Sequence, residues 1–426
     1  MKKQRIETLC VQAGYTPKEG EPRVAPIIQS TTFAYDEPQN MANLFDLTAS
    51  GYFYSRLANP TCGFLEEKVS ALEGGVGGLA TSSGQAASTI SLLNVCKTGD
   101  HVVSAAQLYG GTYNLFAVTL KKLGIDFTFV SAHASKDEIE KCIRPNTKAI
   151  FAESISNPAV VVLNFENFAY VAKKHKILFI IDNTFPTPII CRPFEHGANV
   201  IVHASTKYLD GHATSVGGLV VDGGNFEFEG NERYKDFYTP DESYHGTIYT
   251  KSFGKAAYIV KARAQLMRDL GVCMAPMNAF LTNMGCETLH LRMERTSQNA
   301  LKLAKALKGH KKIEYVNYPA LEGDPSFELT KKYLTNGWGS GVMTIGTVGG
   351  REKAIKFMKN IKIMRMVTHV SDLRSCVLHP ASATHRQLSD EALLKAGVKP
   401  NLLRLSIGIE NGDDIVEDIL NALDKI

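Results

Sequence analysis

The feature that most constrains the fold is a series of short apolar segments, separated by stretches with helical periodicity, between about residues 75 and 222. The apolar segments predict strands: "HVVSAA", "DFTFVS", "KAIFAES", "ILFIID", "NVIVHA" and "GLVVD". Between them, two predicted helical faces are Tyr113, Phe116, Ala117 and Leu120, and Phe165, Phe168, Ala169 and Ala172. This alternation is typical of a mostly parallel sheet with helices on both faces. We therefore expect an α/β fold.

The segments on either side differ from this pattern and predict three regions. Residues 1–62 are irregular and rich in Pro, Asn and Gly, so we expect an N-terminal arm that packs on a neighbouring subunit or on the main domain. Residues 63–255 form the expected large domain. From 256 to 426, a long helix-like stretch, the strand-like "GVMTIGTVG" and "LLRLSIGIE", and a final helix predict a smaller α+β domain.

Composition excludes several classes of protein. Hydrophobic residues make up 44% and charged residues 21%, and the formal charge is only +4 with no basic block. Nucleic acid and an anionic membrane are therefore not expected as partners. The N-terminus lacks a secretory apolar run and no stretch is long enough for a membrane helix, so we expect a cytoplasmic protein. The eight cysteines are dispersed and no histidine motif has metal-ligand spacing, so no metal is expected.

Polar residues follow several predicted strands, where ligands bind in open α/β sheets. Asp182 ends one strand, Lys207 follows the next, and Glu153, Asn157 and Tyr109 follow two others. One crossover and one strand separate Asp182 from Lys207, which places both at the same sheet edge. An acid and an amine would then face one crevice. This spacing alone fits a structural ion pair equally well.

A third element is "ATSSGQAAS", residues 80–88, where small hydroxyl residues and Gly84 precede a helix-like segment. Backbone N–H groups at such a helix start bind anions, and phosphate is the natural guest. A nearby G-x-G-x-x-A match at Gly75, Gly77 and Ala80 follows a helical segment instead of a strand, so we reject it as a dinucleotide motif. An anion site, an acid, a lysine and an aromatic ring together are what pyridoxal phosphate requires.

The chain resembles the pyridoxal-phosphate enzymes of cysteine and methionine metabolism, which have fold type I. The motifs that carry the resemblance occur in the family's order: "YSRLANPT", "SSGQAA", "LYGGTYNLF", "SISNP", "IIDNTF", "HASTKYLDGH", "LHPASATHRQL" and "LRLSIGIEN". The resemblance implies pyridoxal phosphate bound covalently to Lys207. It also implies at least a dimer, and suggests a dimer of dimers.

The resemblance also implies roles for individual residues. Lys207, Tyr109 and Asp182 would be catalytic: Lys207 moves protons, Tyr109 stacks on the ring and Asp182 pairs with the ring nitrogen. The remaining cofactor contacts would come from Ser83, Gly84, Gln85, Asn157, Ser205 and Thr206, and from Tyr54 and Arg56 of a neighbouring subunit's arm. The substrate would contact Arg404, Asn157, Ser371 and Tyr54, with Arg404 holding its carboxylate.

Within the family, the 238–271 segment and "HPASATHRQLSDEALLKAGV" resemble the O-acetylhomoserine sulfhydrylases. This implies γ-replacement on an O-acylhomoserine by sulfide or a small thiol such as methanethiol. Elimination, as in methionine γ-lyase or cystathionine γ-lyase, is the nearest alternative, and Gly111 stands where methionine γ-lyases typically carry cysteine. A non-catalytic nucleotide-binding α/β protein is an alternative of another class.

Two departures from the family pattern stand out. Many relatives read "HSATK" where this chain has Ala204, Ser205 and Thr206 before Lys207. His369 stands where relatives often have Asn or Ser near the substrate carboxylate. A binding role and a satisfied loop histidine are both open for His369.

Overall fold

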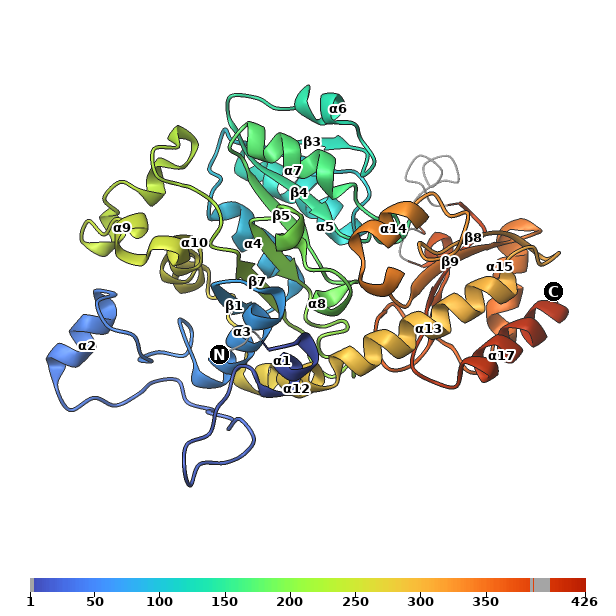
Figure 1. Ribbon diagram of the computed structural model, residues 1–426, viewed down its shortest axis with the longest axis horizontal. Coiled ribbons are helices and arrows are strands. Elements are labelled where there is room, and N and C mark those ends of the chain that lie inside the picture. The colour runs from blue at the N-terminus through green and yellow to red at the C-terminus, as the bar shows by residue number, and fades with distance from the viewer. Residues whose placement is uncertain (1–3, 384–385, 387–398) are drawn as a thin grey trace.

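The computed structural model (Figure 1) describes residues 4–383, 386 and 399–426. In that part of the chain, seven strands form a sheet in the order β1-β7-β6-β5-β4-β2-β3. They are β1 Gly77–Thr81, β2 His101–Ala105, β3 Asp126–Val130, β4 Thr147–Glu153, β5 Leu178–Asp182, β6 Val200–His203 and β7 Gly218–Asp222. Strands β2 to β6 run parallel, whereas β7 is antiparallel to both β6 and β1. The predicted mostly parallel α/β sheet is confirmed.

In this sheet all six predicted strands form, but its remaining strand, β1, was not predicted. Its sequence, "GGLAT", begins with two glycines, which have low strand propensity. A Cβ at Gly78 would lie 2.9 Å from the Glu66 carbonyl oxygen, so glycine lets β1 approach the preceding helix closely. The G-x-G-x-x-A match, which we rejected as a dinucleotide motif, therefore overlaps β1, a strand that follows a helix.

The helices before the C-terminal region are short or of medium length. They are α1 Ile6–Gln12, α2 Pro38–Phe45, α3 Pro60–Glu73, α4 Gly84–Leu93, α5 Gly110–Asn114, α6 Lys136–Glu140, α7 Phe165–Lys174, α8 Thr187–Ile190, α9 Tyr249–Phe253, α10 Ala257–Lys261, α11 Arg268–Leu270 and α12 Pro276–Glu287. Helix α4 packs on β6 and β7, and α7 packs on β4 and β5. Their positions leave the carboxyl edge of the sheet open for a site.

Most of the predicted helical faces are buried, including Phe116, Leu120, Phe165 and Phe168. The prediction is wrong for Tyr113, which is 45% exposed and has its ring centroid 4.7 Å from that of Phe129. The reason is local: α5 continues as a π-helix over Leu115–Thr119 and then as a 3₁₀-helix over Leu120–Leu123. Each change of helical pitch rotates the side chains away from a regular 3.6-residue face.

The C-terminal region is α+β, as predicted. Five strands among the described residues form a second sheet, in the order β10-β11-β12-β9-β8. These strands are β8 Ile313–Asn317, β9 Val342–Thr347, β10 Arg365–Met366, β11 Cys376–Leu378 and β12 Leu402–Ser406. The helices here are α13 Leu289–Leu307, α14 Phe327–Tyr333, α15 Gly350–Asn360 and α17 Gly412–Asp424. Helices α13, α15 and α17 contact one another or this sheet.

Helix α13 connects the two hydrophobic cores (Figure 1). Leu289 and Met293, near its start, belong to the core of the first sheet, whereas Ala300 and Leu303 belong to that of the second. The predicted division at residue 255 stays a prediction, and the packing favours a boundary inside α13. The hydrophobic side chains of α13 at spacings of three and four residues explain how one helix serves both cores.

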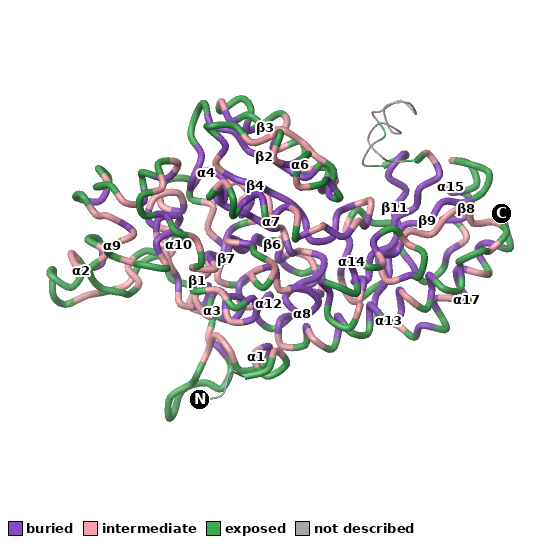
Figure 2. Tube along the Cα trace, turned by 45° about the horizontal axis from the view of Figure 1, so that its top comes forward, coloured by how far each residue is buried: buried purple, intermediate pink, exposed green. Residues whose placement is uncertain are grey.

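The N-terminal arm extends from the body of the molecule, and Figure 2 shows it as largely exposed or intermediate. Helix α1 is anchored, because Cys10 is fully buried and α1 packs against α3 and α12. Helix α2 lies at the outer end of the arm (Figure 1), with Leu44 as its buried residue. No described helix has both the length and the hydropathy needed to cross a bilayer. The motif "HPASATHRQLSDEALLKAGV" lies mostly outside the described residues.

Candidate active site

A cavity of about 200 Å³ lies at the carboxyl edge of the first sheet, facing the second domain. The predicted residues that line it are Ser83, Gly84, Gln85, Tyr109, Asn157, Asp182, Thr206, Lys207 and Arg404. The structure thus brings together the strand ends, the start of α4 and a strand of the C-terminal sheet. A larger hollow of about 1190 Å³ is lined by Pro145, Ile177 and Asn199, which precede β4, β5 and β6 and so mark the opposite edge of the sheet.

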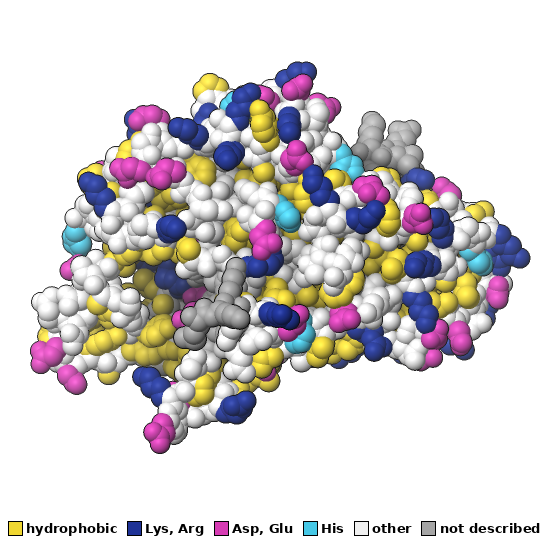
Figure 3. Space-filling model, viewed as in Figure 1, with side chains coloured by type: hydrophobic (Ala, Val, Ile, Leu, Met, Phe, Trp, Pro, Cys, Tyr) yellow, Lys and Arg dark blue, Asp and Glu magenta, His cyan; other side chains and the backbone are white. Residues whose placement is uncertain are grey.

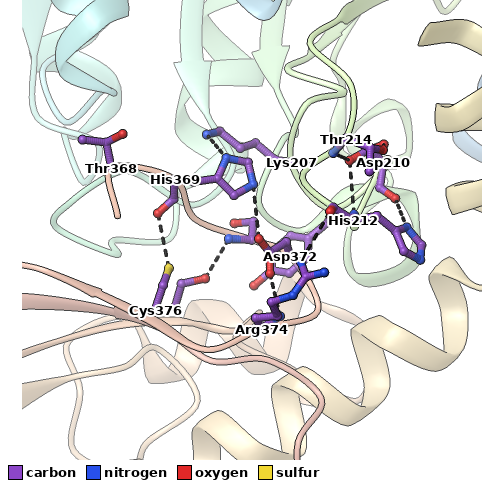
Figure 4. A network of polar contacts seen from close by, with 12 residues as sticks. Lys207, Asp210, His212, Thr214, Thr368, His369, Asp372, Arg374 and Cys376 are labelled. Atoms are coloured by element: carbon purple, nitrogen blue, oxygen red, sulfur yellow. Dashed lines mark hydrogen bonds and ion pairs between the residues drawn. The ribbon is translucent and has the colours of Figure 1, made fainter. Parts of the chain in front are cut away.

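Lys207 lies in the turn that follows β6, and its backbone N–H donates to the carbonyl of Ala204. Burial, and secondarily the positive charge of Arg404, lower the pKa of its amine from 10.5 to about 8. The neutral amine, which is the nucleophilic form, is therefore far more populated near neutral pH than that of an ordinary lysine. The Nζ atom lies 3.5 Å from Nδ1 of His369 (Figure 4).

Asp182 ends β5 and lies in register with Glu153 on β4, so two carboxyl groups meet at the base of the cavity. Burial raises the pKa of Asp182, and hydrogen bonds from the backbone N–H and hydroxyl of Thr184, both to Oδ1, oppose that rise. Burial raises the pKa of Glu153 further, and the neighbouring Asp182 adds to the effect. Asp182 lines the cavity and can hold a proton on a bound heterocycle.

Glu153 was placed at a strand end by the sequence, but its function was not predicted. Its Oε1 accepts the backbone N–H of Tyr109 at 2.6 Å, and its Oε2 accepts that of Asn157 at 3.2 Å. It therefore fixes the two loops that flank the cavity. Thr184, which supports Asp182, was also missed; the signal was a hydroxyl two residues after the strand-end acid in "IIDNTF".

The start of α4, where an anion site is expected, lines the cavity. The Ser83 hydroxyl caps the helix by accepting the Ala86 N–H at 3.1 Å. A Cβ at Gly84 would lie 2.5 Å from Cβ of Ala204, so glycine allows the helix start to approach the turn that carries Lys207. Thr206 lines the cavity from that turn, and its Oγ1 accepts the Gly217 N–H at 3.0 Å.

Two predicted contacts do not line the cavity. Ser205 is fully buried, lies against Gly217, and its hydroxyl has no hydrogen-bond partner in the described structure. The turn directs Ala204 and Thr206 toward the cavity instead, on either side of Ser205. Ser371 is also fully buried, and its backbone N–H donates to Oγ of Ser406, while Thr368 and Val370 line the cavity. A contact from either serine stays a prediction that this geometry does not favour.

Arg404 enters the cavity from β12, in the second domain, and is 7% exposed. Its Nη1 donates to Oδ1 of Asn157 at 3.2 Å, and its Nη2 donates to the carbonyl of Thr368 at 3.1 Å. Among residues 4–383, 386 and 399–426, no carboxylate lies within ion-pair distance of it. A buried guanidinium without an acidic partner is poorly compensated, so a carboxylate ligand fits here.

Tyr109 is 50% exposed and lies at the start of α5, beside the cavity. A Cβ at Gly111 would lie 2.5 Å from the Tyr109 ring and 2.7 Å from Nε2 of Gln85. Any side chain at position 111 would therefore displace groups that line the cavity.

Tyr54 and Arg56 do not reach the cavity of their own chain. Arg56 donates to the carbonyl of Arg268, and its guanidinium lies 5.3 Å from the centre of the Tyr54 ring. Both belong to the extended arm, which the main core does not enclose. Their expected role in a neighbouring subunit stays a prediction.

The fold and the cavity together define a class of protein: an α/β enzyme that holds pyridoxal phosphate. The helix start at Gly84 fits the phosphate, Asp182 fits the ring nitrogen, and the neutral amine of Lys207 fits the aldehyde. Arg404 adds a buried guanidinium to the same cavity, and its expected contact with a substrate carboxylate stays a prediction.

Comparison with known proteins identifies the family. The model of the Cys/Met metabolism PLP-dependent enzymes matches residues 7–424. The O-acetyl-L-homoserine sulfhydrylase of Leptospira meyeri is 42% identical over 99% of this chain and 97% of its own length. The homocysteine synthase of Schizosaccharomyces pombe is 42% identical over 99% of this chain and 98% of its own length.

A solved structure agrees with these matches. The crystal structure of a putative O-acetylhomoserine (thiol)-lyase from Campylobacter jejuni, with N'-pyridoxyl-lysine-5'-monophosphate, has a TM-score of 0.95 and 38% identity. The match covers 99% of this chain and 100% of the Campylobacter jejuni chain. The chain belongs to the Cys/Met metabolism family of PLP-dependent enzymes, and pyridoxal phosphate is its cofactor.

Proposed function

We propose that the protein catalyses γ-replacement on O-acetyl-L-homoserine, in which sulfide, or methanethiol, displaces acetate and gives L-homocysteine, or L-methionine. The names of the similar relatives support this reaction. The observation that carries it is the buried Arg404, free of an acidic partner within the described chain, in the same cavity as Lys207. The two groups suit an α-amino acid, which needs a carboxylate site and a base at Cα.

Several residues that line the cavity have a defined task in the proposed reaction. Pyridoxal phosphate, when bound, supplies an aldehyde that joins to an amine and a ring that takes up the electrons of a broken C–H bond. Arg404 binds the substrate carboxylate as a two-pronged donor. Asp182 keeps the ring nitrogen protonated, which is the state that withdraws electrons. Tyr109 lines the cavity and would stack on the ring, and Glu153 fixes the Tyr109 loop.

Lys207 performs the proton transfers. Its Nζ takes the proton from Cα of the substrate, releases it to the bound cofactor and, neutral again, takes one from Cβ, after which acetate leaves Cγ with the bonding electron pair. Sulfide adds at Cγ, and protons return to Cβ and Cα. The lowered pKa of Lys207 provides the neutral amine for the first step.

Elimination to 2-oxobutyrate is the alternative that uses the same groups. Gly111 argues against a methionine γ-lyase, because a cysteine side chain there would meet Tyr109 and Gln85. The 238–271 segment favours the sulfhydrylases over the lyases.

The deciding experiment measures acetate and amino-acid products with and without sulfide. Homocysteine formation that requires sulfide, in step with acetate release, supports replacement. Dominant 2-oxobutyrate, whether or not sulfide is present, contradicts it. Parallel assays with the O-succinyl ester identify the preferred acyl group. A protein that stays colourless after addition of the cofactor would favour a non-catalytic α/β protein.

We also propose a dimer whose arms complete the neighbouring cavities, and a tetramer of two such dimers. The arm exposes large hydrophobic side chains, including Val24, Phe45 and Tyr54, at 51%, 55% and 40%. Figure 3 shows hydrophobic side chains gathered at the lower left, in the region of α2. A partner subunit would bury them. A cytoplasmic location fits the eight free cysteines.

A further inference from the structure

The side of the cavity where α4 faces α5 carries three polar side chains whose donors are unused. Gln85 and Ser88 lie on α4, Thr112 lies on α5, and all three line the cavity. Ser88 and Thr112 are each only 2% exposed. Gln85 and Ser88 accept the hydroxyls of Thr89 and Ser91 through their carbonyls, but no described residue accepts a hydrogen bond from the three side chains. Buried donors of this kind are poorly compensated unless a ligand accepts from them.

Gly111 shows how closely these groups lie together. A Cβ at position 111 would lie 2.7 Å from Nε2 of Gln85 and 2.5 Å from the Tyr109 ring, so the amide and the ring border one small space. Glycine leaves that space open, and Thr112 follows it directly in the chain. Gln85 and Ser88 share a face of α4, because they are three residues apart. We call Gln85, Ser88 and Thr112 the donor cluster.

The donor cluster is not needed for the other polar groups of the substrate and cofactor. The phosphate contact expected of Gln85 requires only its backbone N–H at the helix start, which leaves the side chain free. Among the described residues that line the cavity, the cations are Lys207 and Arg404, and each already has a proposed task. The acyl ester is the remaining group of the substrate that accepts hydrogen bonds.

Departure of acetate makes that ester a stronger acceptor. The Cγ–O bond breaks, its electron pair stays on the oxygen, and acetate leaves as an anion without taking a proton. The new negative charge is shared with the carbonyl oxygen of the acetyl group. Donors placed at this oxygen therefore bind more strongly as the bond breaks, which lowers the barrier to acetate departure.

We propose that the donor cluster binds the acyl carbonyl of the substrate ester and stabilises acetate as it leaves Cγ. The Gln85 amide is the principal donor, and the hydroxyls of Ser88 and Thr112 lie beside it. Arg404 then holds one end of the substrate and the donor cluster holds the other. This inference deepens the proposed replacement reaction and rests on it.

The first test compares two routes to homocysteine in the holoenzyme. O-acetyl-L-homoserine must lose acetate, whereas L-vinylglycine is the amino acid that remains once acetate has left, so it requires only the addition of sulfide. Gln85→Met keeps the length of the side chain and removes its donor. In this variant, the ratio of kcat/KM for the ester to kcat/KM for L-vinylglycine should fall by about tenfold or more.

Gln298→Met is the matched control, because Gln298 is exposed on α13 and donates to Glu294 at 3.0 Å, outside the cavity. The ratio should not change in this variant. A ratio in Gln85→Met equal to that of the unaltered enzyme, including the case in which both rates fall together, would overturn the site. Absence of homocysteine from both substrates in the unaltered enzyme would contradict the proposed function itself, so the two failures are distinct.

Substitutions at Thr112 separate the hydrogen bond from packing. Thr112→Val keeps the shape of the side chain and loses the hydroxyl, so it should lower the same ratio. Thr112→Ser keeps the hydroxyl and loses the methyl group, so it should preserve the ratio. The opposite order would contradict a donor role. Weaker retention of pyridoxal phosphate by Thr112→Val during dialysis would assign the hydroxyl to the phosphate and remove it from the acyl site.

A second test measures binding without acetate departure. Nγ-acetyl-L-2,4-diaminobutyrate keeps the acyl carbonyl but has an amide nitrogen in place of the ester oxygen, and L-2-aminoheptanoate has the same chain length without a carbonyl. Cofactor absorbance in the holoenzyme gives the dissociation constant of each. The preference for the amide analogue should shrink by about tenfold in Gln85→Met. An equal preference in the variant and the unaltered enzyme would contradict the carbonyl contact.

Discussion

At the residue scale, the site depends on the contrast between two cations that share one cavity. Arg404 keeps its charge and lies ready for a carboxylate, while its field and the burial of Lys207 favour the uncharged amine. In the proposed reaction, the arginine that binds the substrate thus also helps to provide the neutral amine of Lys207. The proposed binding role of Arg404 and the proposed reactive role of Lys207 can each be tested by a separate experiment.

Replacement of Arg404 by lysine should lower kcat/KM for O-acetylhomoserine by about 10- to 100-fold, because one ammonium cannot replace two charged hydrogen bonds. Steady-state kinetics measure the change. The matched control is Arg365→Lys, on the exposed strand β10. Equal kinetics for Arg404→Lys and the unaltered enzyme would contradict binding of the substrate carboxylate by Arg404.

The rate at which the cofactor-free enzyme recaptures pyridoxal phosphate should follow the neutral fraction of Lys207. Its pKa of about 8 predicts a rate that rises with pH up to about 8 and then levels, instead of rising toward 10.5. Stopped-flow absorbance across this range provides the measurement. In Arg404→Met the midpoint should move upward, since a positive neighbour is lost; a midpoint near 10.5 in the unaltered protein would contradict the effect of burial.

At the scale of elements, the site is made where strand ends, one helix start and one loop meet. Lys207, Asp182 and the Gly84 helix start could be predicted from sequence, because the ends of apolar runs and a glycine after small hydroxyl residues mark such positions. It could not be predicted from sequence which side chains of the turn around Ser205 face the cavity, since a shift of one residue changes the answer. The contact of His369 with Lys207 could not be predicted either, because the loop that carries His369 has no hydrophobic periodicity from which its path could be inferred.

The N-cap of α4 should serve both stability and cofactor binding. Ser83→Ala removes the bond to the Ala86 N–H and should lower the free energy of unfolding by about 1 kcal/mol. It should also weaken retention of pyridoxal phosphate during dialysis. Asn411→Ala removes a comparable cap from α17, where Asn411 accepts the Asp413 N–H at 2.8 Å, and should lower stability alone. Equal cofactor loss in both variants would argue against a phosphate site at α4.

At the scale of the whole molecule, two cores joined by α13 bring Arg404 of β12 to the edge of the first sheet. The α/β and α+β halves could be predicted from their patterns, but β1 and the Tyr113 face could not. The two glycines of β1 have low strand propensity, and the changes of helical pitch after α5 rotate Tyr113 away from the buried face. The irregular sequence of residues 1–62 predicted an arm with little core of its own, and its contact with a neighbouring subunit stays a prediction.

Subunit mixing tests the role of the arm. Arg56→Ala and Lys207→Ala should each have low activity alone, but a dimer of one of each has one cavity with both groups. Random reassociation of equal amounts should restore about a quarter of the activity of the unaltered enzyme. No recovery, with mixed dimers shown by mass spectrometry, would place Arg56 outside the neighbouring cavity.

The central claim is that the Lys207 amine holds pyridoxal phosphate. Borohydride reduction of the holoenzyme followed by peptide mapping tests it most directly. The account predicts a pyridoxyl group on the peptide that contains Lys207 and its loss in Lys207→Ala. A label on another lysine, or none on a protein saturated with cofactor, would contradict it.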